Sequence, residues 1–253
     1  MQSYLNAILA ITEDAAKIPR SFFRKPLSIE NKEDASPVTI ADQRTEEFIR
    51  SELARQFPDH SILGEEFGQS TKDSDWHWII DPIDGTRSFI SGMPLYGMLI
   101  ALLHKGTPVL GVVRMPELSE VYTGTSAGAF VNLTAALKVS ETTVLEHAFL
   151  YVNEGEKLLA EQPETLRKLC ASGRDRRFGY DCYPHMLMAS GHIDACVDYD
   201  LKPYDFLPLV PIIQAAGGVV TDWAGQPLGL HSDGRVASAA TTALHGALLE
   251  LLN

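Results

Sequence analysis

Two carboxylates lie three residues apart at the end of an apolar run, in the segment 81–86 (DPIDGT). Such charges repel each other, and at the end of a buried strand they would be costly without a counter-ion. The proline fixes one backbone torsion and the glycine permits one that other residues avoid, so the chain can bend sharply here. A bend would bring together the carboxylates of Asp81 and Asp84 and the carbonyl of Ile83. Three converging oxygens suit a hard cation such as Mg²⁺, so the segment is a candidate metal site.

The end of the same segment could bind a phosphate. Thr86 begins an expected short helix, and Gly85 directly precedes it. Backbone N–H groups at a helix start can hold a phosphate, so these two residues are candidate phosphate ligands. The alternative is a surface turn with solvated acids, but the apolar strand in front and the threonine behind favour a site. One short segment is therefore predicted to bind both a metal ion and a phosphate.

Three further acids are candidates, and each also has an ordinary structural interpretation. Glu65 lies in a Gly-Glu-Glu segment, where a solvated loop would be common. Asp205 directly precedes an apolar helix, where aspartate is a favoured N-cap residue. Asp42 stands near the start of another expected helix, where an acid suits the positive end of the helix dipole. Each signal is weak alone, but the order and spacing of the four acidic elements are specific.

The composition argues against several classes of partner. The chain has 253 residues, 45% hydrophobic content and a formal net charge of −12, which allows a buried core in one or two domains. The acidic balance argues against binding to nucleic acid and to anionic membrane surfaces, which both attract basic patches. An acidic protein that acts on a phosphate needs a bound cation to reverse the local field. We therefore expect a small-molecule phosphate ester as substrate, with neither nucleic acid nor membrane as a partner.

The cysteines and the N-terminal segment favour a cytoplasmic protein. Cys170, Cys182 and Cys196 form no close C-x-x-C pair, so they give no support to zinc or redox chemistry and suit free thiols in a reducing compartment. Glu13 and Asp14 interrupt the apolar N-terminal run, which is typical of an amphipathic helix and not of a signal peptide. No apolar stretch approaches the roughly 20 residues that a membrane span requires.

Hydrophobic periodicity and turn residues indicate a layered fold. Helices are predicted over residues 4–18, 40–57, 183–190, 206–216 and 241–252, and strands over 75–80, over 193–197 and on both sides of 105–108. This mixture favours an α/β or α+β enzyme over a helical bundle or a β-sandwich. We interpret 139–145 as a junction. One subdomain is expected over 1–138, with the metal and phosphate motifs, and another over 139–253, with the substrate-side residues and one metal ligand.

Together these motifs resemble the inositol-monophosphatase superfamily over nearly the whole length of the chain. The matching elements are Ser36-Pro37-Val38-Thr39 with Asp42, Gly64-Glu65-Glu66, residues 78–86 (WIIDPIDGT), Tyr204-Asp205 and Ala216-Gly217-Gly218. Within the superfamily the chain is most similar to the histidinol-phosphate phosphatase branch. This similarity rests on residues 85–92 (GTRSFISG), 179–183 (GYDCY) and 201–206 (LKPYDF), which are less specific than the superfamily motifs.

The resemblance implies a five-layered αβαβα sandwich, usually dimeric, that hydrolyses a phosphate ester with a metal-activated water. It implies two or three Mg²⁺ ions on five ligands: Glu65, Asp81, the Ile83 carbonyl, Asp84 and Asp205. Gly85 and Thr86 would hold the phosphate. Glu65 would lie near the activated water, and Thr86, hydrogen-bonded to Asp42, would orient that water and help take its proton. The segment 124–132 is shorter than the Gly-rich hairpin usual in the family, but it contains none of these ligands.

The branch resemblance implies L-histidinol phosphate as substrate, cleaved to L-histidinol and phosphate in histidine biosynthesis. The amine and the imidazole of this substrate need acids beside the metals. The resemblance places Asp198, Asp181, Tyr180 and Gly179 near the amine and the imidazole. The ordinary interpretation of Asp198 and Asp181 is that both are acids on the protein surface. An inositol-1-monophosphatase or a related sugar or nucleotide phosphatase remains an alternative, because a polyol needs no excess of carboxylates. A catalytically silent phosphate-binding regulatory protein is the alternative from another class.

Other polar residues are weaker candidates. His104, His185 and His192 lack metal-ligand spacing, so we treat them as ordinary structural residues. Ser88 has no G-x-S-x-G context and is not expected to be a nucleophile. The cluster of Arg174, Arg176 and Arg177 is typical of a solvated face, or it could border a phosphate pocket or the site of a dimer partner.

Overall fold

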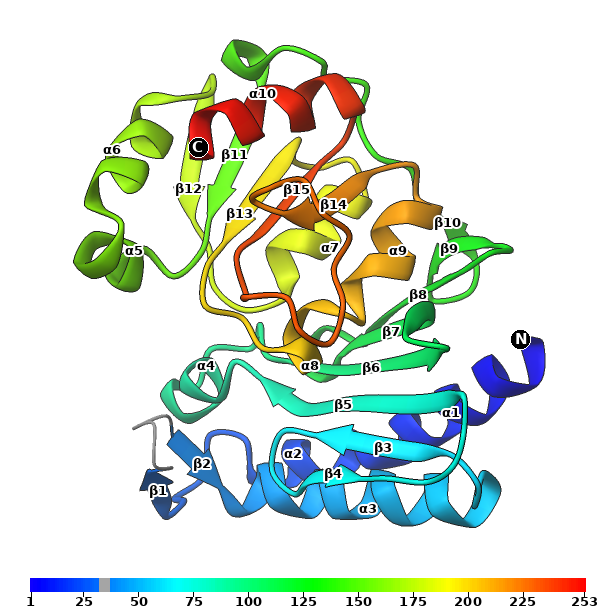
Figure 1. The fold of residues 1–253 in the computed structure, drawn as a ribbon. Helices are drawn as coiled ribbons and strands as arrows, with labels where there is room; N and C mark the ends of the chain where they lie inside the picture. The colour runs from blue at the N-terminus through cyan, green and yellow to red at the C-terminus, as the bar shows by residue number, and fades with distance from the viewer. Residues whose placement is uncertain (32–36) are drawn as a thin grey trace.

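Most of the strands form two large sheets that are separated and flanked by helices (Figure 1). The computed structural model describes residues 1–31 and 37–253, so Ser36 of the predicted motif lies outside the described residues. From one side to the other, the layers are helices, an eight-stranded sheet, helices, a five-stranded sheet and helices. The five-layered αβαβα sandwich implied by the resemblance is confirmed.

The eight-stranded sheet comes from the first half of the chain, in the order β10-β9-β8-β7-β6-β5-β3-β4. Its strands are β3 (Ser61–Gly64), β4 (Gly68–Ser70), β5 (Trp76–Asp84), β6 (Gly97–His104), β7 (Thr107–Met115), β8 (Glu120–Thr125), β9 (Gly128–Val131) and β10 (Ala135–Ala136). Neighbours are antiparallel except β3 and β5, which run parallel and end at the same edge of the sheet. A separate antiparallel pair consists of β1 (Ile29–Asn31) and β2 (Pro37–Thr39).

The five-stranded sheet comes from the second half, in the order β12-β11-β13-β15-β14. Its strands are β11 (Phe149–Val152), β12 (Asp175–Phe178), β13 (Ala195–Asp198), β14 (Val219–Asp222) and β15 (Val236–Ala239). The central strand β13 runs parallel to β11 and antiparallel to β15. The expected junction at 139–145 lies between the last strand of the large sheet and the first strand of the small one.

The helices form the three other layers (Figure 1). One outer layer contains α1 (Gln2–Ala15), α2 (Lys17–Phe22) and α3 (Ile40–Gln56), and the opposite one contains α5 (Gly155–Glu161), α6 (Pro163–Ala171) and α10 (Thr242–Leu252). Between the sheets lie α7 (Tyr183–Ala189), α8 (Pro203–Phe206) and α9 (Leu209–Ala215). The short helix α4 (Thr86–Ser91) follows β5, and two 3₁₀ turns span Pro116–Leu118 and Leu145–His147. No helix in the described part of the chain is both long and apolar enough to cross a membrane.

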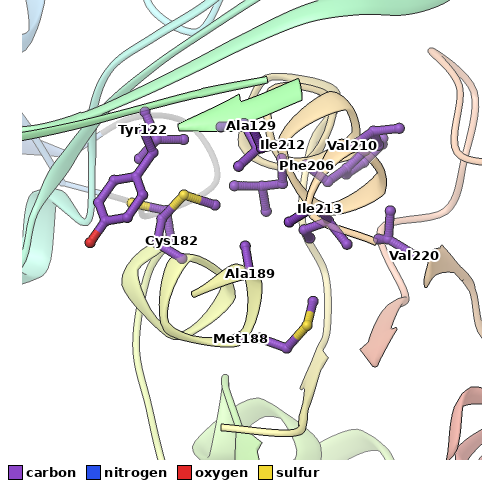
Figure 2. Packing of buried hydrophobic residues seen from close by; sticks show 14 of the residues in the cluster. Tyr122, Ala129, Cys182, Met188, Ala189, Phe206, Val210, Ile212, Ile213 and Val220 are labelled. Atoms are coloured by element: carbon purple, nitrogen blue, oxygen red, sulfur yellow. The ribbon is translucent and has the colours of Figure 1, made fainter. Parts of the chain in front are cut away.

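Alternating side chains bury both faces of the large sheet. On β5, Trp78 and Ile80 pack toward α1 and α3, whereas Ile79 packs toward the middle helices. Figure 2 shows part of this second cluster, where Met188 of α7 and Ile213 of α9 lie among the side chains between the sheets. A strand covered on both faces is apolar at nearly every position, as β6 is. This double burial holds the end of β5 rigidly at the site described below.

Two predicted helices are divided in the structure, in both cases near a proline. The helix predicted over 4–18 is α1 followed by α2, because Pro19 has no N–H to donate to the carbonyl one turn earlier. The helix predicted over 206–216 is α8 followed by α9, with Pro208 at the junction and Pro211 inside α9. The elements β11, β12, β15, α5 and α6 were not predicted; each is short, with nine residues or fewer.

Candidate active site

A β-bulge at the end of β5 produces the predicted bend. Asp81 is paired with Leu99 of β6, but Asp84 is paired with Gly97, so β5 contains one extra residue here. The backbone N–H of Ile83 donates to Asp81 Oδ1 at 3.0 Å. Both acids are buried, with 2% and 9% of their surfaces exposed. The bulge therefore directs two neighbouring carboxylates into one place.

Asp205 joins these two acids from another part of the fold. One carboxylate oxygen from each of Asp81, Asp84 and Asp205 lies within 4.8 Å of the others. Asp205 is not the N-cap that its sequence position suggested, because it is the third residue of α8. Its Oδ2 accepts from the backbone N–H of Lys202, the N-cap residue, at 2.6 Å. The helix start thus orients a carboxylate that also faces the cluster.

Burial and neighbouring acids raise the affinity of all three acids for protons. Burial raises the pKa of Asp81 well above its ordinary value, and the nearby Glu65 and Asp84 raise it further. Burial also raises the pKa of Asp84, with Asp181 and Asp205 adding to the shift, and raises that of Asp205 to about 7. A bound cation would favour the ionised forms of all three. Oxygen ligands at this spacing fit a hard divalent cation such as Mg²⁺.

Glu65 reaches the same place from the neighbouring strand. It directly follows β3, and its backbone N–H donates to the carbonyl of Ile80 on β5 at 3.1 Å. Because β3 and β5 are parallel, their carboxyl ends meet at one edge of the sheet. Glu65 lines a cavity of about 650 Å³ together with Asp81, Asp84 and Asp205.

Thr86 and Asp42 form a hydrogen-bonded pair beside the acids. The Thr86 hydroxyl donates to Asp42 Oδ1 at 3.0 Å. Asp42 Oδ2 accepts from the backbone and hydroxyl of Thr39, at 2.9 and 2.6 Å, in the capping box that begins α3. Asp42 is fully buried, and burial raises its pKa. Since the Thr86 hydrogen is held by Asp42, the oxygen lone pairs of Thr86 can accept from a water in the cavity.

Gly85 begins α4 in a conformation that a side chain would not tolerate. Its φ of 86° is in the left-handed region, and a Cβ would lie 2.4 Å from Cγ of Asp181. Gly85 and Thr86 both line the cavity, next to the metal-ligand candidates. The absence of a side chain thus lets the loop that carries Asp181 approach the DPIDGT segment closely.

Asp181 connects this segment to the second half of the chain. Its carboxylate accepts from the Ser88 hydroxyl, and burial raises its pKa to about 6. The next residue, Cys182, donates its backbone N–H to Asp84 Oδ2 at 2.6 Å. Asp181 lines the cavity, so the ordinary interpretation as a surface acid is wrong. Ser88 serves here as a hydrogen-bond donor.

Asp198 lies at the end of β13 and also lines the cavity. It is only 2% exposed, so it too is not a surface acid. The other two predicted substrate-binding residues differ from these acids in their surroundings. Tyr180 is 48% exposed, and Gly179 packs against Asn153 and Pro184. The residues that line the cavity include neither Gly179 nor Tyr180, so both remain predictions as substrate-binding residues.

The walls of the cavity are strongly acidic. Within the described residues, the cavity lining includes nine acids, Glu65, Asp81, Asp84, Glu154, Glu156, Asp181, Asp198, Asp200 and Asp205, and three basic residues, Arg87, Lys157 and Lys202. Lys157 and Lys202 both pair with Asp200, which reduces their influence on the other acids. The remaining excess of negative charge suits metal cations together with a cationic part of a substrate.

Sequence reasoning gave no role near the site to His185, and some of its other candidates lie outside the site. His185 is fully buried, and its ring lies 3.1 Å from Asp198. The spacing of residues in the sequence could not identify His185 as part of the site, because its hydrogen-bond partners come from other segments of the chain. His104 instead stacks on Trp76 of the large sheet. The three arginines at 174–177 do not line the cavity, and most of them belong to the exposed edge strand β12.

Comparisons with known proteins agree with this geometry. The sequence model of the Inositol monophosphatase family matches residues 1–253. The chain is 38% identical to a histidinol-phosphatase of Chlorobaculum parvum, over 92% of this chain and 91% of that protein. It is 40% identical to the chloroplastic bifunctional phosphatase IMPL2 of Arabidopsis thaliana, over 86% of this chain but only 63% of that protein.

The fold comparison leads to the same family. An inositol monophosphatase structure from Zymomonas mobilis superposes with a TM-score of 0.90 at 36% identity, over 99% of this chain and 98% of that one. The family that matches the whole chain is a phosphatase family, and the relatives named here are phosphatases as well. The protein therefore belongs to the inositol monophosphatase family and is a hydrolase of phosphomonoesters.

Proposed function

We propose that the protein is a Mg²⁺-dependent histidinol-phosphate phosphatase that acts in histidine biosynthesis in the cytoplasm. The observation that carries the proposal is a single cavity lined by the metal-type carboxylates of Asp81, Asp84 and Asp205 and, in addition, by Asp181 and Asp198. Histidinol phosphate has a matching distribution of charge, with a phosphate at one end and a cationic amine at the other. The Chlorobaculum histidinol-phosphatase supports this choice of substrate.

Two or three Mg²⁺ ions would be held by Glu65, Asp81, the Ile83 carbonyl, Asp84 and Asp205. When bound, they would lower the pKa of a water, offset charge on the phosphate oxygens and stabilise the leaving alkoxide. Gly85 and Thr86 would bind the phosphate, and this role is supported by their position in the cavity lining together with these ligands.

The Thr86–Asp42 pair would orient the attacking water. Thr86 donates to Asp42, so its oxygen is left to accept a hydrogen bond from the water. The buried carboxylate of Asp42, with its raised pKa, can then receive a proton that passes through the hydroxyl. The attack is in line with the leaving group and needs no covalent intermediate on the enzyme. Glu65 lines the same cavity and would lie near this water.

The amine end of the substrate would be recognised by Asp198 and Asp181. Hydrogen bonds between a charged donor and a carboxylate are about twice as strong as neutral ones. The loop that contains Gly179 and Tyr180 supports this end of the cavity, because Asp181 follows directly.

An inositol phosphatase is the second candidate, and the Zymomonas mobilis structure supports it. A polyol phosphate carries no amine, so it does not use the excess of carboxylates on the cavity wall. A silent phosphate-binding protein is less well supported, because it has no need of a metal-type cluster together with the Thr86–Asp42 pair.

A panel of phosphate esters tests the proposed function. Phosphate release from histidinol phosphate, inositol 1-phosphate and p-nitrophenyl phosphate would be measured with Mg²⁺ and with EDTA. We expect the highest kcat/KM with histidinol phosphate and loss of all activity in EDTA. A preference for inositol phosphate would refute the substrate while leaving the metal mechanism intact. Phosphate binding without turnover would support the silent alternative.

We also propose a homodimer. Several apolar side chains on the segments around Gly85 and Asp181 are exposed: Ile90, Met93, Phe178 and Tyr180. The contact between Ser88 and Asp181 places these two segments next to each other. Light scattering during gel filtration would distinguish a dimer of about twice 27.8 kDa from a monomer. The same dimer could place the arginines of β12 near a partner's site.

A further inference from the structure

A buried hydrogen-bonded network lies behind Asp198. His185 of α7 is fully buried, and its Nε2 lies 3.1 Å from Asp198 Oδ2. The other ring nitrogen, Nδ1, lies 3.1 Å from the hydroxyl of Ser238 on β15. Asn153, which follows β11, donates from Nδ2 to the same Asp198 oxygen at 2.6 Å. Two side chains from different elements thus converge on one carboxylate oxygen.

The chemistry of the groups determines the direction of the His185 contact. An ionised carboxylate only accepts, so Nε2 of His185 carries the hydrogen that lies between the two residues. In a neutral ring, Nδ1 then accepts from the Ser238 hydroxyl; in a charged ring, Nδ1 donates to the Ser238 oxygen. His185 therefore donates to Asp198 in either charge state.

The network leaves Asp198 able to bind one more donor. Its Oδ1 accepts from the backbone N–H of Tyr199 at 2.9 Å, so three hydrogen bonds are occupied in all. A carboxylate can accept about four. Asp198 lines the cavity, and this remaining acceptor position is available to a ligand there.

Asn153 also connects the two substrate-side acids. Its Nδ2 donates to the backbone carbonyl of Asp181 at 3.1 Å as well as to Asp198. Both hydrogens of this amide are thus committed to the acids. One buried side chain, which is 1% exposed, therefore bridges Asp181 and Asp198.

We propose that His185 and Asn153 are positioning residues that hold Asp198 in place for the cationic part of the substrate. This inference rests on the proposed function, in which Asp198 accepts a hydrogen bond from the substrate amine. A carboxylate that is already fixed loses little conformational freedom when the amine binds, and it presents its free acceptor position at a defined place. A purely structural network would affect stability but would not distinguish between substrates.

The test is the ratio of kcat/KM for histidinol phosphate to kcat/KM for p-nitrophenyl phosphate, which has no amine. His185→Leu removes the donor, and we expect this ratio to fall about 10-fold or more, as for a lost hydrogen bond to a charged group. His185→Gln keeps an N–H donor and should recover part of the loss. His245→Leu is the matched control: His245 is also buried, but it bonds to Thr221. Its ratio should equal that of the wild type.

Several outcomes would overturn the inference. An unchanged ratio in His185→Leu would do so, and so would equal losses on the two substrates. If His185→Leu does not fold, Asn153→Ala removes the other donor and is judged by the same ratio. Asp198→Asn separates the two proposals. If Asp198→Asn lowers the ratio but loss of the donors does not, only the positioning role fails. If the wild type does not prefer histidinol phosphate, the proposed function fails and the positioning role falls with it.

Discussion

At the scale of single residues, the crowding of Asp81 and Asp84 gives opposite expectations for activity and for stability. Burial and neighbouring acids raise the pKa of Asp84, so its ionised form destabilises the metal-free fold. We therefore expect Asp84→Asn to abolish turnover without lowering the unfolding temperature measured in EDTA. Phosphate release at saturating Mg²⁺ and thermal unfolding would be measured on the same preparation. Near-normal turnover would refute the metal-site assignment.

Asp198 offers a test of substrate recognition. Removing its charge with Asp198→Asn should cost about 1.5–3 kcal/mol in kcat/KM for histidinol phosphate, the value of a hydrogen bond to a charged group. Inositol phosphate and p-nitrophenyl phosphate should lose less, because neither has an amine. Asparagine is preferable to alanine here, because truncation would leave the buried donors of His185 and Asn153 without an acceptor. Equal losses on all three substrates would show that Asp198 only supports the site generally.

At the scale of elements, the junction of β5 and α4 depends on Gly85. Gly85→Ala introduces a methyl group at positive φ and directly against Asp181, so we expect a stability loss of about 1–3 kcal/mol and a strong loss of activity. Gly106, in the turn between β6 and β7, is the matched control. Its φ is 80°, but a Cβ there would meet nothing within 4 Å. Gly106→Ala should lose stability only, as measured by urea unfolding and kcat/KM. A fully active Gly85→Ala would contradict the proposed close approach.

At the scale of the whole molecule, metal binding should be coupled to stability. Mg²⁺ binds the folded protein preferentially, which at 100 times its Kd stabilises the fold by about 2.7 kcal/mol. For a chain of this size, that corresponds to a rise of roughly 5–10 °C in the unfolding temperature. Calorimetry across a Mg²⁺ titration would measure the rise. Asp84→Asn should lose most of it, and a wild-type protein that shows no shift at millimolar Mg²⁺ would speak against a preformed acidic site.

The same acids should make the metal-free protein less stable as the pH rises. The pKa of Asp205 is raised from 3.8 to about 7 and that of Asp181 to about 6, so the folded state keeps protons that the unfolded chain has lost. The associated stability is complete below pH 3.8 and is lost as the pH rises to about 7. Thermal unfolding in EDTA over this range would show the fall, and Asp205→Asn should show a shallower one. If the wild type and Asp205→Asn lost stability equally steeply with rising pH, that result would argue against these pKa shifts.

The way in which the two large sheets are connected determines whether the two halves of the chain can be treated as separate units. The predicted subdomains 1–138 and 139–253 meet where the large sheet ends; the first contains the eight-stranded sheet and the second the five-stranded one. The middle helices of the second half nevertheless pack on the large sheet of the first, in one continuous hydrophobic cluster. The two halves therefore share a core, although their sequences could be divided by pattern alone.

The sequence by itself determined the candidate metal motif and the type of fold. Asp81, Ile83 and Asp84 are close along the chain, so a local bend is enough to bring their oxygens together, and an apolar strand before them leaves few places for that bend. The layered fold class was predicted in the same way, from the hydrophobic periodicity of individual segments. The roles of Glu65, Asp42 and Asp205 came from the resemblance, because no local spacing connects these acids.

Only the tertiary structure decided the surroundings of Asp198. His185, Asn153 and Ser238 come from a helix and from two other strands or their ends, and each is an ordinary residue within its own segment. Their convergence arises from the register of β11, β13 and β15 and from the packing of α7 against that sheet. Hydrogen bonds between residues so far apart in the chain depend on how whole elements pack, and spacing within a segment carries no record of that packing.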